Sequence, residues 1–187
     1  MLEQRIQQQF FESADLQYEC AETLSRQVVD ATQSLLNTLT AGGKVLLFGA
    51  GAASGLASHL HRLLVGRFER ERPPLAAVLL QESAELATAQ LLALAQPGDA
   101  LLFIDDPAHA SPDSAASCAE AAHQREAHVV LISKSRPAAW PDPLLETDVR
   151  VTLPHLRPAR VLEAQLLVLH ALCDALDTQL LGEQETS

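Results

Sequence analysis

The first 40 residues repeat apolar side chains at intervals of three and four, the spacing of an amphipathic helix. The repeating positions are Ile6, Phe10, Ala14, Tyr18, Ala21, Leu24, Val28, Leu35 and Leu39. No proline interrupts this stretch, and two glycines at 42–43 end it. The pattern predicts N-terminal helices over residues 1–41, as one long helix or as two consecutive helices with a break near Ser25.

Five short apolar runs follow, and each has the length of a β-strand. They span residues 44–48, 75–80, 100–104, 128–132 and 149–153. The first four are almost continuously apolar, which is typical of parallel strands covered by helices on both faces. The segments between these four runs, at 54–72, 83–96 and 114–126, have helical spacing. The alternation predicts a three-layer, doubly wound, flavodoxin-like α/β core over residues 44–153, with a five-stranded parallel sheet.

A last helix is expected over residues 158–181, with Pro158 in its first turn and Gly182 after its end. Its leucines recur at alternating steps of four and three, and further apolar side chains widen the stripe. The stripe indicates either a helix buried within one subunit or a helical surface that packs against another copy. We expect a single domain over residues 1–187, because a chain of this length supports one hydrophobic core.

Composition and charge exclude several classes of function. The chain has 24 Asp and Glu against 13 Lys and Arg, a formal net charge of −11 that disfavours direct nucleic-acid binding. We expect a cytoplasmic protein, because no membrane span and no secretion signal can be recognised. The cysteines at 20, 118 and 173 are odd in number and far apart. We therefore interpret them as small buried side chains.

A glycine-rich turn follows the first strand and is the strongest local indication of a binding site. Residues 49–55 read Gly-Ala-Gly-Ala-Ala-Ser-Gly. Such a turn exposes backbone N–H groups that can hold a phosphate without a cationic side chain. It lacks the Gly-Lys-Ser/Thr ending of a nucleotide P-loop and the third glycine of a dinucleotide fingerprint. The alternative is tight packing of strand and helix with no ligand.

Two smaller features remain. One is a group of three arginines, Arg67, Arg70 and Arg72, which alternate with two glutamates, and the other is Trp140, which lies in a proline-rich loop. For the arginines we expect a solvated, salt-bridged helix end, with contact between Arg67 and a ligand in a neighbouring subunit as the alternative. Trp140 either anchors its loop on the sheet or marks a contact surface.

Several sequence segments of the chain resemble the sugar isomerase (SIS) domain family, in the branch that contains phosphoheptose isomerase and the DnaA initiator-associating protein DiaA. They lie at 66–75 (GRFERERPPL), 95–102 (AQPGDALL), 120–123 (EAAH) and from 159–160 (AR) to 170–174 (HALCD). The resemblance spans nearly the whole chain and implies the SIS fold with an N-terminal helical extension. It also implies a homotetramer with sugar-phosphate sites between subunits and, in the isomerases, a zinc ion.

The resemblance assigns phosphosugar binding to the glycine-rich turn and to the loop after the third strand. The matching positions are Gly49, Gly51, Ala53 and Ser54 on the turn, and Ser111 near the loop. The family's loop reads Ser-Thr-Ser-Gly-Asn-Ser, whereas this chain has Asp-Asp-Pro-Ala-His-Ala at 105–110. Ionised Asp105 and Asp106 would repel a phosphate dianion. The alternative role for these two carboxylates is a solvated cap at the strand end.

The zinc ligands that the resemblance implies match His59, Leu63, Leu162 and His170. Two imidazoles remain, but leucine replaces both oxygen donors, and a catalytic zinc site normally has three protein ligands. We therefore expect no cofactor, with zinc at His59 and His170 only if the chain is an isomerase. His170 also lies one helical turn before Asp174, which predicts a hydrogen-bonded pair.

These departures favour a non-catalytic SIS-domain protein of the DiaA type. As a homotetramer it would bind the replication initiator DnaA by presenting several docking sites at once, and residual phosphosugar binding stays open. The alternative is a phosphosugar isomerase acting on sedoheptulose phosphate, with His170 as acid or base. A third interpretation is a site for a regulatory phosphosugar without turnover. Direct contact with nucleic acid or a membrane is expected in none of them.

Overall fold

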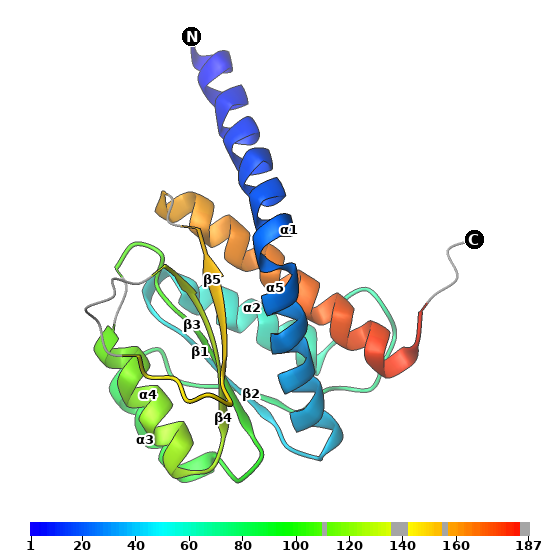
Figure 1. Ribbon diagram of the computed structural model, residues 1–187, viewed down its shortest axis with the longest axis vertical. Helices are drawn as coiled ribbons and strands as arrows, with labels where there is room; N and C mark the ends of the chain where they lie inside the picture. Colours follow the sequence, from blue (N-terminus) through cyan, green and yellow to red (C-terminus); the bar gives the residue numbers. More distant parts are fainter. Residues whose placement is uncertain (110–111, 136–141, 155–156, 184–187) are drawn as a thin grey trace.

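The computed structural model describes residues 1–109, 112–135, 142–154 and 157–183 of the chain. A five-stranded parallel sheet lies at its centre (Figure 1). The strands are β1 (Val45–Gly49), β2 (Ala77–Leu79), β3 (Ala100–Ile104), β4 (His128–Lys134) and β5 (Val149–Leu153). Their order is β2-β1-β3-β4-β5, and every neighbouring pair is parallel. The predicted doubly wound α/β fold is confirmed.

Helices cover both faces of the sheet. They are α1 (Leu2–Thr40), α2 (Ser54–Val65), α3 (Ala84–Leu94), α4 (Pro112–Gln124) and α5 (Pro158–Leu181), with a 3-10 turn, η1 (Gly51–Ala53), before α2. One face packs against α1, α2 and α5, and the other against α3 and α4 (Figure 1). Among the described helices, none combines the length and hydropathy needed to cross a bilayer. The assignment of the whole chain to one domain stays a prediction.

The N-terminal segment is one helix, α1, and the break predicted near Ser25 does not occur. The Ser25 hydroxyl donates a hydrogen bond to the carbonyl of Ala21 one turn earlier, so its polar side chain has a partner inside the helix. The second half of α1 packs on the sheet and α5, whereas its first turns project beyond the other elements (Figure 1). Phe10, in the first half of α1, is 72% exposed.

α2 ends at Val65, earlier than the predicted helix over 54–72, because the residues that follow turn back towards the sheet. Arg72 returns into the protein, where its side chain is 1% exposed. Its Nε–H donates to Asp177 Oδ1 at 2.5 Å, and its other N–H groups donate to the carbonyls of Leu63 and Leu64 at 2.8 and 2.9 Å. Carbonyls in the last turn of a helix have no partner within the helix; here the Leu64 carbonyl also accepts a hydrogen bond from the Leu75 N–H at 3.0 Å. The prediction of a solvated helix end is therefore wrong for Arg72.

The three cysteines, Cys20, Cys118 and Cys173, are free and buried, as the sequence indicates. Burial and the neighbouring Asp177 carboxylate raise the pKa of the Cys173 thiol to about 12. A thiol with this pKa stays protonated at neutral pH and packs as a small apolar group.

Loss of the Arg72 guanidinium would leave the Asp177 carboxylate buried without a cation. We expect Arg72→Met to lower the free energy of unfolding by about 3–5 kcal/mol, because an uncompensated buried charge is strongly destabilising. The matched control is Arg67→Met, since Arg67 pairs with Glu71 in solvent and such pairs contribute about 0–1 kcal/mol. Urea unfolding followed by circular dichroism measures both variants. Equal losses in the two would show that the buried pair has no special role.

Candidate functional site

The strand order identifies a switch point at the C-terminal edge of the sheet. From β1 the chain passes to β2 on one side, and then crosses to β3 on the other side of β1. Parallel α/β sheets bind ligands at such points, beyond the carboxyl ends of the strands. Gly49 ends β1, and its register partner Ile104 ends β3. The glycine-rich turn and the loop that begins at Asp105 are therefore neighbours at this edge.

The glycine-rich turn depends on close backbone packing. A Cβ on Gly49 would meet the carbonyl carbon of Ala53 at 2.7 Å, so no side chain fits there. Gly51 has φ +51°, in the left-handed region that favours glycine. The N–H of Ala53 donates to the Ala50 carbonyl at 2.9 Å, and the N–H of Ala50 donates to the Ile104 carbonyl at 2.9 Å. Of the predicted ligand positions, Gly49 and Ala53 thus hold the turn itself together.

Two hydroxyl residues, Ser54 and Ser111, are predicted to bind the phosphosugar, and the structure describes one of them. Ser54 is the first residue of α2 and is partly exposed, and its N–H donates to the Gly51 carbonyl. Ser111 lies outside the described residues, as does Trp140. Ser54 is therefore the hydroxyl that the described structure brings to the switch point.

The Asp106 carboxylate lies against the glycine-rich turn. Its Oδ1 accepts hydrogen bonds from the N–H groups of Ala108 at 2.8 Å and His109 at 3.3 Å, and its Oδ2 accepts one from the N–H of Ala52 at 3.4 Å. A Cβ on Gly51 would overlap with Oδ2, so the glycine makes room for this carboxylate. Asp106 therefore connects the loop after β3 to the turn after β1, which is more than a solvated cap.

Asp105 is buried, with 5% of its surface exposed. Gln165 of α5 reaches the same strand end, where its Nε2 donates to the Asp105 carbonyl at 2.8 Å. Gln165 is fully buried, and its Oε1 has no hydrogen-bond partner in the described part of the chain. The sequence analysis does not identify Gln165. The signal that could have found it is a polar residue inside the leucine-rich stripe of α5.

Two histidines connect α2 to α5. His59 Nε2 and His170 Nε2 lie 2.9 Å apart, so one ring donates a hydrogen bond to the other, and the ring of Phe68 packs beside His170. Burial lowers the pKa of His59, and the charges of His170 and Arg62 lower it further. The predicted partner of His170, Asp174, is exposed, so the prediction is corrected to a bond with His59.

The described residues do not fit a catalytic zinc ion. The positions that the resemblance assigns to oxygen ligands are Leu63 and Leu162, whose side chains have no metal-binding atom. Within the described ranges, no three His, Cys, Asp or Glu side chains come together as a metal site. The imidazoles of His59 and His170 supply two donors, one fewer than a catalytic zinc normally takes from the protein.

Comparison with known proteins identifies the family. The model of the SIS domain matches residues 9–133 of the chain. The chain belongs to the SIS domain family. A phosphoheptose isomerase of Methylibium petroleiphilum is 42% identical to this SIS-domain chain over 99% of it and 98% of the relative.

Solved structures agree with this assignment. The phosphoheptose isomerase GmhA of Neisseria gonorrhoeae superposes with a TM-score of 0.82 at 29% identity, covering 95% of this SIS-domain chain and 100% of its own. A phosphoheptose isomerase of Francisella tularensis superposes with a TM-score of 0.84 at 28% identity, covering 95% and 99%.

These relatives overturn the prediction of a non-catalytic, DnaA-binding protein of the DiaA type. This SIS domain is similar to phosphoheptose isomerases over nearly its full length and nearly the full length of each relative. This similarity favours the isomerase alternative. The prediction relied on the loss of zinc ligands and phosphate-loop hydroxyls. Those losses change the chemistry of the site, but the switch point, the glycine-rich turn and both imidazoles remain.

The close packing at Gly49 can be tested with a second glycine of the same region as control. We expect Gly49→Ala to lower the free energy of unfolding by about 1–3 kcal/mol, because the added methyl group overpacks the turn. At Gly55, in the first turn of α2, an added Cβ meets nothing within 4 Å. Gly55→Ala is therefore expected to raise the free energy of unfolding by about 0.4–1 kcal/mol, because alanine lowers the entropy of the unfolded chain. Chemical denaturation measures both, and an unchanged stability of Gly49→Ala would contradict the packing argument.

Proposed function

We propose that this chain is a sugar-phosphate isomerase that acts on a heptose phosphate such as sedoheptulose phosphate. The observation that carries the proposal is the 42% identity over 99% of the chain with a phosphoheptose isomerase. The geometry supports it, because α2 begins at the glycine-rich turn and carries His59 five residues after Ser54. Five residues correspond to about 7.5 Å along a helix, which is comparable to the length of a small sugar phosphate.

The reaction moves a proton between neighbouring carbons. A base takes the proton from the carbon next to the carbonyl, the C–H electron pair forms the enediol double bond, and the carbonyl oxygen receives a proton. The proton then returns to the former carbonyl carbon, while the neighbouring hydroxyl loses its own proton and becomes the new carbonyl. We assign His170 as this acid and base. His59, whose pKa is lowered, orients the His170 ring through the Nε2–Nε2 hydrogen bond.

We assign no metal to this reaction. Two imidazoles and two leucines form the positions where the resemblance implies a zinc ion, and this donor set lacks a third ligand. Polarisation of the substrate carbonyl then falls to hydrogen-bond donors of the protein. His59 and His170 act through proton transfer and orientation.

Removal of the His170 imidazole tests the assignment directly. We expect His170→Ala to lower kcat/KM for sedoheptulose phosphate by about 10²–10⁴-fold, the usual contribution of a general acid–base group. The control is His61→Ala, which removes an imidazole from α2 two residues beyond His59, on a different face of the helix. We expect its kcat/KM to stay within about twofold of the wild type. Absence of turnover by the wild-type protein would contradict the isomerase proposal.

The same assay, repeated with added zinc and with a chelator, tests the metal-free assignment. Turnover should be unchanged by either addition, and the purified protein should contain far less than one zinc per chain. Stoichiometric zinc that disappears in both His59→Ala and His170→Ala would contradict the assignment.

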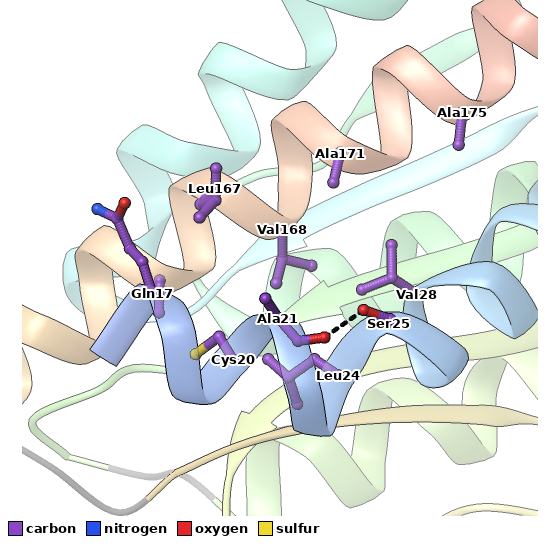
Figure 2. Close-up of a pocket in the computed structure, with 11 residues that line it drawn as sticks. Gln17, Cys20, Ala21, Leu24, Ser25, Val28, Leu167, Val168, Ala171 and Ala175 are labelled. Carbon is purple, nitrogen blue, oxygen red and sulfur yellow. Dashed lines mark hydrogen bonds between the residues drawn. The ribbon is translucent and has the colours of Figure 1, made fainter. Parts of the chain in front are cut away.

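We further propose that four copies of the chain assemble through α1 and α5. A mostly apolar groove of about 410 Å³ lies between these helices (Figure 2). Its lining residues are Gln17, Cys20, Ala21, Leu24, Ser25, Val28, Ala164, Leu167, Val168, Ala171 and Ala175. Phe10, Phe11 and Tyr18 of α1 are also exposed. Exposed apolar surface of this kind is typical of contact with another protein chain.

A charge at the exposed Phe10 of α1 should disrupt this assembly. We expect wild-type protein to have the mass of four chains, and Phe10→Glu to shift it to smaller species, because a carboxylate would be buried in the interface. Gln33→Glu is the control, since it adds the same charge to an exposed position of α1 that lies over the body of the molecule. Light scattering after size-exclusion chromatography measures the mass. A monomeric wild type, or equal effects of the two variants, would contradict the proposed interface.

A further inference from the structure

The switch point already binds an anion, which is the chain's own Asp106 carboxylate. Three backbone N–H groups, from Ala52, Ala108 and His109, donate to its two oxygens. They come from the loops after β1 and after β3, which meet where this sheet topology places ligands. Convergent backbone N–H groups of this kind also form the anion sites that hold phosphates.

The Asp106 carboxylate depends on these N–H groups. Two buried carboxylates elsewhere in the described structure have a cation: Asp99 pairs with Lys44 at 2.5 Å, and Asp177 pairs with Arg72 at 2.5 Å. Within the described residues, Asp106 forms no ion pair, and its side chain is only partly buried. Its contact with Ala52 N–H is long, at 3.4 Å. Asp106 therefore has few contacts to lose when its side chain rotates away.

Gly51 shows that the turn accommodates this carboxylate. Its φ of +51° brings the backbone against Asp106, and any side chain at position 51 would overlap with Oδ2. The space beside Gly51 is therefore filled by a carboxylate oxygen, and this carboxylate belongs to Asp106 in the loop after β3.

We propose that the Asp106 carboxylate occupies the phosphate position of the site and must leave it before a phosphorylated sugar binds. Asp106 is then a specificity-determining residue. It competes with the ligand's phosphate for the same N–H donors, and its negative charge repels a dianion that approaches while it is in place. The inference deepens the proposed isomerase function and rests on it for the identity of the ligand, but the competition itself concerns any phosphate.

Inorganic phosphate is the probe that separates this inference from the isomerase proposal. Asp106→Ser removes the charge and shortens the side chain, and Asp106→Asn removes the charge at constant size. We expect Asp106→Ser to bind phosphate at least tenfold more tightly than the wild type, with Asp106→Asn in between. Isothermal titration measures the affinity, and the phosphate-dependent rise of the melting temperature reports the same order, because the ligand binds only the folded protein.

Glu82→Gln is the matched control. Glu82 is exposed and follows β2 at the same edge of the sheet, so the variant makes the same change in net charge outside the Asp106 contacts. We expect its affinity for phosphate to stay within twofold of the wild type. Circular dichroism of all variants checks that the fold is retained, and Asp106→Asn keeps an oxygen acceptor for the Ala108 and His109 N–H groups.

The outcomes are distinct. Equal phosphate affinity in the wild type and both Asp106 variants overturns the inference, and so does an equal gain in Glu82→Gln. Tighter phosphate binding by the Asp106 variants supports it, even if no variant turns over a heptose phosphate, in which case only the isomerase proposal fails. If the wild type is an active isomerase, a KM for sedoheptulose phosphate that does not fall in Asp106→Ser also overturns it.

Discussion

The turn between β1 and α2 has no space for a side chain at Gly49, and this constraint positions both halves of the site. Because the turn is tight, only Ala50 and the 3-10 turn η1 separate β1 from α2, and α2 carries His59 against His170 of α5. The same turn presents the Ala52 N–H towards the loop after β3. Backbone geometry at one glycine thus connects the imidazole pair to the anion-binding end of the sheet.

The sequence predicts the fold well wherever hydrophobic burial decides the structure. The expected bounds of β3 and β5 agree with those observed. Both faces of β3 contribute to apolar cores, and alternate residues of β5 pack into one of them. Local patterns fail where a distant partner decides the outcome. The spacing around Arg72 indicates a solvated helix end, but Asp177, more than one hundred residues later, draws the guanidinium into the interior. A hydroxyl at Ser25 is compatible with a break, yet it bonds within the helix.

The site shows the same limit in a different form. Sequence reasoning names leucine at the zinc positions that the resemblance implies, and aspartate in the phosphate loop that it implies. It then interprets each change as a loss, and so predicts a protein without catalysis. Full-length similarity to phosphoheptose isomerases contradicts that interpretation. In the structure, Asp106 bonds to both loops of the switch point, and the retained His170 bonds to His59 and not to the predicted partner Asp174.

The leucines near the imidazole pair and the aspartate at the glycine-rich turn both make the site less attractive to a phosphate dianion. On the proposed metal-free assignment, with leucine at positions 63 and 162, no divalent cation attracts a phosphorylated sugar, and the lowered pKa of His59 favours its neutral form. The favourable contacts for a phosphate then come mainly from backbone N–H groups, which carry only partial charges. Asp106 competes for those same groups with a full negative charge. Its influence on ligand affinity is therefore larger in this chain than it would be beside a bound metal ion, where the cation would offset much of the repulsion.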